Sequence, residues 1–324
     1  MSVLEEIRAK EKALHRTVIL PEGNEERTLK AARMLIDEGL ANVILVENEK
    51  SIRDTAARLN VNLDGIQIAD PATSPRAAEF ATLIYEKRKH KGMTPEKAAV
   101  LSVDPVYFAT CMLETGMAQA MVTGAVHSTG DMLRPALQIL GTAPGTKTVS
   151  SMFLMILPDG KLLGFGDCAV VPDPTPDQLS DIAIASATTF KTLTGIEPVV
   201  AMLSFSTKGS AEHDMVTKVR EATELAHQKA PQLVLDGELQ FDAAYVPSVG
   251  ARKAPGSPVA GKANVFIFPE LNAGNIGYKM VQRLANAQAI GPISQGLAKP
   301  ANDLSRGCSP EDIRDVCCIA LLNA

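Results

Sequence analysis

Three side chains suited to acid–base chemistry or anion binding lie close together near the C-terminus, in the segment NDLSRGCSPED. Ser305 offers a hydroxyl, Arg306 a permanent cation and Asp312 a carboxylate. A helix should begin directly after them, because Ser309 is a favoured N-cap residue and Pro310 suits the first helical position. Backbone N–H groups at a helix N-terminus attract phosphate. The stretch therefore predicts a site for a phosphate-bearing ligand.

A purely structural explanation of this stretch is also open. Ser309 and Asp312 fit the capping-box pattern S-x-x-D, and Arg306 could be an ordinary surface arginine. Cys308 in the same loop could be reactive, but a packing role is the more common one for such a cysteine. Apolar residues then recur with helical spacing, which predicts a final amphipathic helix with one buried face. These residues are Ile313, Val316, Cys317, Ala320 and Leu321.

A second loop, GAVHSTG, follows the predicted strand AQAMVT and carries Ser128 and Thr129, with Arg134 in the helix after it. Ligands of open α/β sheets bind beyond the carboxyl ends of the strands, so these three residues are placed where a phosphate could be held. Plain helix capping by Ser128 or Asp131 explains the pattern equally well. His127 could be a base, although a lone loop histidine is more often structural or exposed.

The remaining pattern supplies elements that would position these loops. TVILP, a helix ending at Gly39, and ANVILVE form a strand–helix–strand unit, which opens a parallel sheet with right-handed crossovers. Thr94-Pro95 and Asp104-Pro105 predict two further helix starts. Strands and helices alternate throughout, so the fold class is α/β, and 324 residues suffice for two domains.

The second half of the chain is expected to open on a β-hairpin over 149–157 and 162–171. The dipeptide Gly291-Pro292 predicts a last strand that is short or irregular. PSVGARKAPGSPVAGK is expected to be a long loop without periodicity. The other expected elements are helices at 76–89, 175–193, 211–228 and 272–286, and strands at 198–205, 233–236, 265–268 and 289–294.

Composition narrows the function classes. A net charge of -5 and a pI of about 5.6 argue against nucleic-acid binding. No uninterrupted apolar run is long enough to span a membrane, and the N-terminus does not resemble a signal peptide. Five cysteines without a C-x-x-C pattern indicate free thiols in a reducing cytosol, so a cytoplasmic protein is expected.

Near matches to nucleotide-binding motifs fail in their context. GSPVAGKA lacks the metal-binding Ser or Thr of a phosphate-binding Walker loop and is followed by a strand. GFGDCA lies inside the predicted hairpin and opens no helix, so it is a weak dinucleotide fingerprint. H-E-x-x-H and G-x-S-x-G are both absent from the sequence.

Longer segments resemble a known family. SPVAGKANVFIFPELNAGNIGYKMVQRLANAQAIGPISQGLAKPANDLSRGCSPEDI, residues 257–313, resembles the C-terminal half of the bacterial and archaeal phosphate acetyltransferases. MVTGAVHSTGDMLRPALQIL resembles their N-terminal signature, and LPEGNEERTLKAA and the length also fit. The resemblance covers essentially the whole chain. Phosphate butyryltransferases share the loop style and remain the alternative for the acyl group.

The resemblance implies reversible acetyl transfer between CoA and phosphate, by direct thiolate attack on acetyl phosphate in a ternary complex. It implies no metal and no other cofactor. The implied fold has two α/β domains with an interdomain cleft, similar to the isocitrate and isopropylmalate dehydrogenases, in a homodimer. Domain I would comprise residues 1–146 plus 297–324, and domain II residues 147–296.

The resemblance also implies roles for individual residues. Asp312 would take the thiol proton, Arg306 would be the catalytic arginine, and Ser305 would bond the developing oxyanion or the phosphate. A carboxylate beside an arginine and a helix N-terminus is a weak base, so Asp312 could instead orient the thiol or Arg306. The residues expected to bind CoA or phosphate are Arg88, Arg134, Arg283, Ser128, Thr129, Asn272, Tyr278 and Lys279.

Two other classes stay open at this point. An NAD-dependent β-decarboxylating dehydrogenase would share the fold, but the sequence offers no carboxylate cluster for its metal and no nicotinamide loop. A non-catalytic phosphate- or CoA-binding regulator would use the same anion-binding residues without turnover.

Overall fold

The computed structural model describes residues 2–324, which divide into two compact units. Unit 1 comprises Met1–Pro144 and Leu297–Ala324, and unit 2 comprises Gly145–Gly296. The last 28 residues thus belong to the same unit as the N-terminal half, since 324 − 296 = 28. The sequence predicts the first division after residue 146, two residues beyond the Pro144 boundary of the units.

Unit 1 alternates strands and helices. In chain order its elements are α1 (Val3–Lys12), β1 (Thr17–Pro21), α2 (Glu26–Asp37), β2 (Asn42–Val46), α3 (Glu49–Leu59), β3 (Ile66–Ala69), α4 (Ala77–Arg88), the 3₁₀ turn η1 (Lys89–Lys91), α5 (Pro95–Leu101), α6 (Pro105–Glu114), β4 (Ala120–Val122), α7 (Thr129–Pro135), the π-helical turn η2 (Ala136–Leu140), β11 (Ala301–Asn302) and α13 (Pro310–Leu322).

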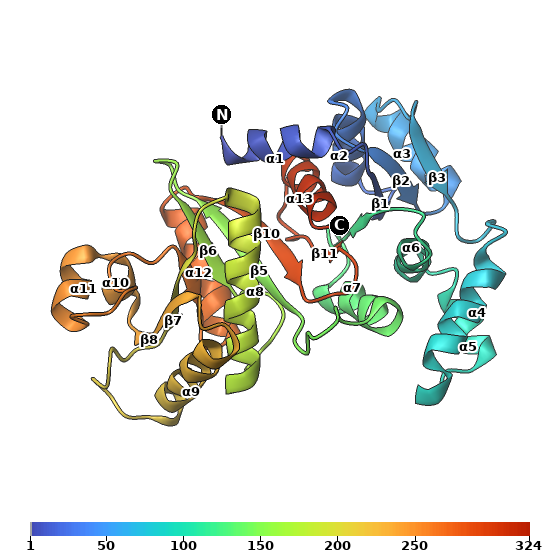
Figure 1. Ribbon diagram of the computed structural model, residues 1–324. Helices are drawn as coiled ribbons and strands as arrows, with labels where there is room; N and C mark the ends of the chain where they lie inside the picture. Colours follow the sequence, from blue (N-terminus) through green and yellow to red (C-terminus); the bar gives the residue numbers. More distant parts are fainter. Residues whose placement is uncertain (1) are drawn as a thin grey trace. The chain divides into compact units, whose positions relative to one another are not determined.

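The sheet of unit 1 has the strand order β11-β4-β1-β2-β3, and the paired strands run parallel. Its central strands are almost wholly apolar and buried, as expected for strands covered on both faces. α13 packs against α1, α2 and β4, whereas α6 packs against β1, β2 and β4 from the other side (Figure 1). The carboxyl ends of β4 and β11 therefore lie side by side at one edge.

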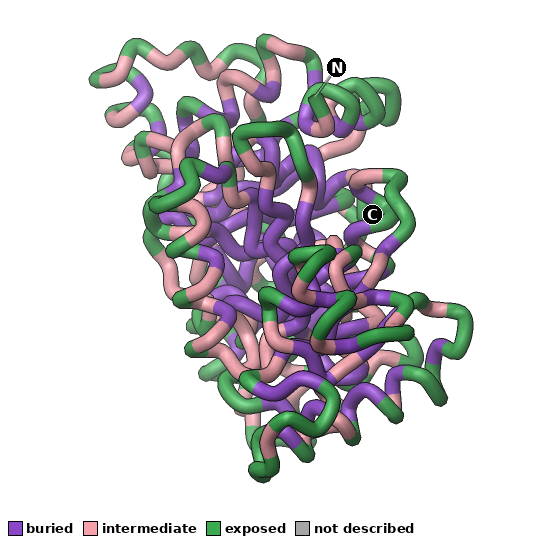
Figure 2. Tube along the Cα trace, turned by 90° about the vertical axis from the view of Figure 1, so that its left-hand side faces the viewer, coloured by how far each residue is buried: buried purple, intermediate pink, exposed green. Residues whose placement is uncertain are grey.

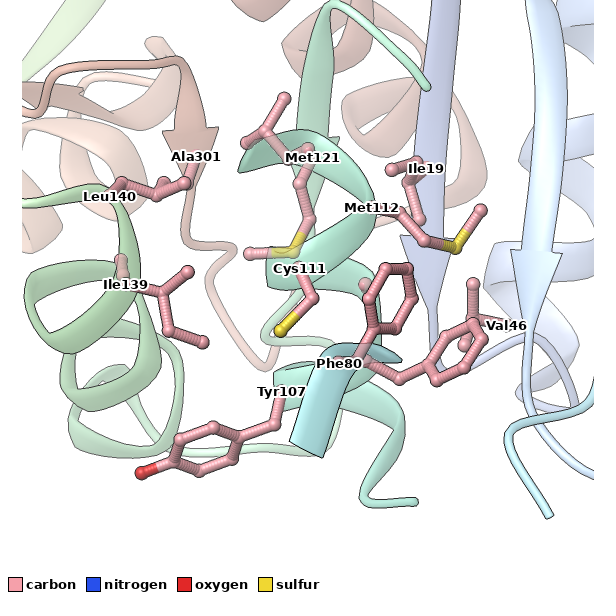
Figure 3. Close-up of a cluster of buried hydrophobic side chains, with 14 of the residues drawn as sticks. Ile19, Val46, Phe80, Tyr107, Cys111, Met112, Met121, Ile139, Leu140 and Ala301 are labelled. Carbon is pink, nitrogen blue, oxygen red and sulfur yellow. The ribbon is translucent and has the colours of Figure 1, made fainter. Parts of the chain in front are cut away.

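A hydrophobic cluster fills the space between this sheet and α4, α6 and η2. Phe80 and Phe108 meet edge to face at 4.9 Å, and Cys111, Met112 and Met121 pack around them. Tyr107 lies at the margin of the cluster with its hydroxyl directed away from it (Figure 3). Buried residues run through the interior of the trace, with exposed residues at its periphery (Figure 2).

Unit 2 comprises β5 to β10 and the helices between them. In chain order its elements are β5 (Ser150–Ile156), β6 (Leu162–Gly166), α8 (Pro176–Thr194), β7 (Val199–Leu203), α9 (Asp214–Lys229), β8 (Val234–Leu239), α10 (Phe241–Tyr245), α11 (Pro247–Lys253), β9 (Val265–Ile267), α12 (Leu271–Leu284) and β10 (Gln288–Gln295).

The sheet of unit 2 is mixed, with the order β10-β5-β6-β9-β7-β8. β5 and β6 form the predicted antiparallel hairpin, and β6, β9, β7 and β8 are parallel. GFGDCA lies at the end of β6, so no helix follows its glycines and the dinucleotide interpretation has no structural support. Phe153 of β5 faces α12, where it stacks on Tyr278.

Several sequence-based expectations were wrong. The stretch 247–262 is not structureless, because Pro247–Lys253 forms α11, where Gly250 lies directly against the backbone of Ala260 and Gly261. The prediction of a short or irregular last strand is confirmed in its second form, because the register of β10 shifts between Ile290 and Ile293. α1, α3 and β3 were not anticipated. α3 buries only Ile52 and Ala56, too few apolar residues to show a helical period.

Within residues 2–324, no helix has the length and apolar character needed to cross a membrane.

Candidate active site

The loop of Ser305 and Arg306 leaves β11 at the edge where the Gly124–Thr129 loop leaves β4. Ser305 is half-buried, and Arg306 is exposed. The guanidinium of Arg306 makes no hydrogen bond to any described residue, although its charge acts on buried Asp303. An arginine fork with open donors is suited to a phosphate, because it can bind two oxygens at once.

Asp312 is part of a capping box at the start of α13, as the structural explanation predicted. The hydroxyl of Ser309 accepts from the N–H of Asp312 at 3.1 Å, and Asp312 Oδ2 accepts from the N–H of Ser309 at 2.9 Å. Asp312 is half-buried, and no hydrogen bond within the described residues uses Oδ1. One carboxylate oxygen therefore holds the helix start, and the other is available to a ligand.

Arg27 ties the two site loops together, and nothing in the sequence pattern marked it. Its Nη1 donates to the carbonyl oxygens of Arg306 at 2.7 Å and Cys308 at 3.2 Å. Its Nη2 donates to the carbonyl oxygen of Ala125 at 2.9 Å, and Glu25 holds Nε at 2.7 Å. One guanidinium thus fixes the spacing of segments 98 and 279 residues away in sequence.

Cys308 packs against the guanidinium of Arg27 and is buried. Burial raises the pKa of its thiol to about 11, with the charge of Arg27 opposing the rise. A thiol of this kind is mostly protonated and unreactive at neutral pH, which agrees with the packing role expected for it.

The N–H groups of the Gly124–His127 loop do not face a ligand. Glu22, 3% exposed, accepts all four of them at 2.8–3.1 Å, and its Oε1 contacts His127 Nδ1 at 2.8 Å. Burial alone would raise the pKa of Glu22, but these hydrogen bonds outweigh it and lower the pKa below its usual value. The loop is therefore shaped around a buried carboxylate that the sequence analysis missed.

Ser128 and Thr129 also make their hydrogen bonds within the protein. Ser128 caps α7 in a capping box with Asp131, so the capping explanation accounts for its hydroxyl. Thr129 Oγ1 donates to Asp303 Oδ2 at 2.5 Å, which joins the β4 loop to the β11 loop a second time. Their direct contact with substrate stays a prediction.

Asp303 is a second buried acid that sequence reasoning missed. It is 3% exposed, and burial raises its pKa to about 6 despite the hydrogen bond from Thr129. Its Oδ1, Asn302 Nδ2 and Thr123 Oγ1 are buried without a hydrogen-bond partner among the residues that the structure describes. Gly124 makes this packing possible, because a Cβ there would meet Asp303 Oδ1 at 2.2 Å.

Arg134 and Arg88 come from different helices and lie around one tyrosine. Arg134 is exposed on α7, and Arg88 is half-buried at the end of α4. Burial raises the pKa of Tyr107, whose hydroxyl donates to Gln138 at 3.0 Å, and the charges of both arginines oppose that rise. The structure thus brings both predicted anion-binding arginines to a common neighbour on unit 1.

The remaining predicted residues lie on α12 of unit 2. Asn272 is exposed in its first turn, and Arg283 is exposed in its last. Lys279 is exposed and donates to Asn275 at 2.7 Å. Tyr278 is buried and stacks on Phe153 at 4.0 Å, so its ring supports the helix from within the unit. Roles of these residues toward substrate stay predictions.

The fold and site together define an α/β class in which Arg134 and Arg306, both predicted to bind anions, follow the carboxyl ends of two neighbouring parallel strands. Residues 2–321 match the family profile described as "Phosphate acetyl/butaryl transferase". The chain belongs to this family of acyltransferases.

Individual relatives agree. The chain is 54% identical to a phosphate acetyltransferase of Clostridium acetobutylicum, over 100% of this chain and 99% of the relative. A solved phosphotransacetylase from Streptococcus pyogenes superposes with a TM-score of 0.94 and 45% identity, over 99% of this chain and 97% of that one.

A distant likeness concerns the fold alone. A protein described as a 4-hydroxythreonine-4-phosphate dehydrogenase from Salmonella typhimurium superposes with a TM-score of 0.56 at 14% identity, over 95% of this chain and 99% of that one. The expected dehydrogenase-like α/β fold is thereby confirmed.

Proposed function

We propose that this chain is a phosphate acetyltransferase that moves an acetyl group reversibly between CoA and phosphate. The observation that carries the proposal is the open guanidinium of Arg306, whose backbone carbonyl is held by Arg27 at the edge shared by β4 and β11. The relatives described above, which carry this activity in their names, support the choice of acyl chemistry.

The site residues have clear tasks in such a reaction. The nucleophile is the thiolate of CoA, and an unperturbed thiol has a pKa of ~8.5, so a neighbouring base or cation increases the reactive fraction. Asp312 Oδ1 is available to accept the thiol proton or to orient the thiol. Attack on the acetyl carbon builds negative charge on the carbonyl oxygen, and the Ser305 hydroxyl is a suitable donor to it.

The arginines would bind the phosphate groups of acetyl phosphate and CoA. Arg306 can hold two oxygens of acetyl phosphate and offset the charge that grows on the leaving group. Arg134 and Arg88, whose charges both act on Tyr107, are suited to the phosphates of CoA. The proposal includes no metal and no other cofactor, and CoA is a substrate. A homodimer and a cytoplasmic location also belong to the proposal.

One assay tests this function and its nearest alternative. Purified protein is mixed with CoA and either acetyl phosphate or butyryl phosphate, in the presence of EDTA and without NAD, and loss of free thiol is followed together with formation of the acyl-CoA. We expect rapid acetyl-CoA formation and slower reaction with butyryl phosphate. A preference for butyryl phosphate would reassign the acyl group, and no thiol loss with either donor would overturn the proposed function.

A further inference from the structure

Glu22 and His127 form a carboxylate–imidazole pair at the substrate edge of unit 1. Glu22 is fully engaged, with four backbone N–H groups and His127 Nδ1 on its two oxygens. The pair fixes the protonation of Nδ1 and the orientation of the imidazole, because a carboxylate acceptor requires a proton on Nδ1. The side chain of His127 is 34% exposed, and Nε2 has no hydrogen-bond partner among residues 2–324. The bond to Glu22 therefore orients Nε2, and no described residue bonds to it.

His127 lies between the two tethers of the site loops. Two residues before it, Ala125 is bound by Arg27, which also holds the backbone of Arg306. Two residues after it, Thr129 bonds Asp303, which precedes Ser305 by two positions. The imidazole thus lies at the same edge of the unit 1 sheet as the loop that carries the open guanidinium of Arg306.

Three acidic residues favour the protonated form of this imidazole. Glu22 faces it from the loop after β1, Asp104 from the start of α6 and Asp131 from α7. The hydrogen bond to Glu22 raises the pKa of His127 above its usual value, and partial burial opposes the rise only in part. The hydrogen bond to Glu22 and these charges thus favour the form of His127 that carries a proton on Nε2.

Acetyl transfer to a thiol needs such a proton. When the C–O bond of acetyl phosphate breaks, the departing group would leave as a trianion unless a proton reaches it. We propose that His127 is a further catalytic residue, whose Nε2–H donates a proton to the departing phosphate oxygen, and that Glu22 is its positioning residue. This inference rests on the proposed function.

The step balances in both directions. The S–C bond forms as the C–O bond breaks, the thiol proton passes to Asp312 or solvent, and the Nε2 proton passes to phosphate. The products are acetyl-CoA and hydrogen phosphate, and one proton returned to Nε2 resets the site. In the reverse direction neutral His127 takes the proton from hydrogen phosphate as the phosphate oxygen attacks the thioester.

Two substitutions separate this chemistry from a structural role. In His127→Asn, the amide NH₂ lies near the position of Nδ1, keeps the bond to Glu22 and removes Nε2. In His127→Gln, the amide nitrogen lies near the position of Nε2, but it cannot exchange a proton. His227→Gln is the matched control, because His227 is an exposed histidine in the last turn of α9 in unit 2.

The readout is the pH profile of acetyl-CoA formation from about pH 6 to about pH 9, with thermal unfolding of each variant as a folding check. We expect wild-type turnover to fall on the alkaline side as His127 loses its proton. His127→Asn and His127→Gln should lose about 10²-fold or more at the optimum and lack that alkaline fall. The control should match wild type.

Glu22→Gln provides an independent check on the pair. Without the carboxylate the imidazole holds its proton less tightly, so the alkaline fall should move to lower pH while His127 is still present. The proposal is overturned if folded His127→Asn turns over within about twofold of wild type, or if both histidine variants keep the wild-type alkaline fall. A wild-type protein that forms no acetyl-CoA would instead overturn the proposed function.

Discussion

Arg27 Nη1 donates to the carbonyl oxygen of Arg306 at 2.7 Å, so one arginine fixes the backbone of another whose side chain stays open to a ligand. The two residues are 279 positions apart, and the contact joins the N-terminal part of unit 1 to its C-terminal return. A loop held this way fixes the backbone from which the guanidinium extends, which lowers the entropy cost of orienting a substrate phosphate.

Replacing Arg27 should loosen both loops at once. Arg27→Met keeps the aliphatic stem but removes the donors to Arg306, Cys308 and Ala125. We expect the KM for acetyl phosphate to rise and turnover to fall by about tenfold or more, since small misplacements of catalytic groups are costly. Lys30→Met, on the same helix and in an exposed pair with Glu26, is the control. Steady-state kinetics that match wild type for Arg27→Met would refute this role.

Asp312 has an observed role in helix capping and a proposed role in the reaction, and two substitutions separate them. Asp312→Asn keeps an oxygen that can accept from the N–H of Ser309, so stability should change little. Asp312→Ala removes the acceptor of the Ser309 N–H but leaves the Ser309 cap, and should cost about 0.5–1.5 kcal/mol of unfolding free energy. Both variants should lose turnover if the carboxylate serves the thiol. Denaturant titrations and rates measured together test this, and an unchanged rate and pH profile in Asp312→Asn would exclude a role as base.

Glu11 makes the stability of unit 1 depend on pH. It is 0% exposed on α1, neither carboxylate oxygen has a hydrogen-bond partner within residues 2–324, and burial raises its pKa from 4.5 to about 7. The folded state therefore binds more protons than the unfolded state between these two values. Stability should fall as pH rises through this window, by roughly 1–3 kcal/mol.

The test of the Glu11 prediction uses Glu11→Gln and Glu11→Leu. Gln cannot titrate, so the fall in unfolding free energy between about pH 5 and about pH 8 should shrink. Leu also removes the buried charge, so that variant should be more stable than wild type at the higher pH. Equal pH dependence in all three proteins would show that Glu11 does not titrate in this range.

The sequence was informative where the signals were local. The α13 capping box, the proline-started helices and the hairpin of unit 2 all rest on residues within a few positions of one another, and the structure has each of them.

The missed site residues depend on contacts distant in sequence. Glu22 is 102–105 residues from the N–H groups that it accepts, and Asp303 is 174 residues from Thr129. In the sequence they are ordinary acids, and only the pairing of β1, β4 and β11 brings them to one edge. The backbone N–H groups of the β4 loop thus bind an internal carboxylate, and no sequence motif indicated this contact.

The catalytic role of Arg306 is tested most directly by measuring acetyl-CoA formation from CoA and saturating acetyl phosphate by wild type and Arg306→Ala. Because Arg306 is exposed and its guanidinium bonds no described residue, the variant should unfold at the same temperature as wild type. We expect rapid turnover by wild type and a loss of about 10²-fold or more in the variant. Wild-type turnover in a folded Arg306→Ala protein would contradict it.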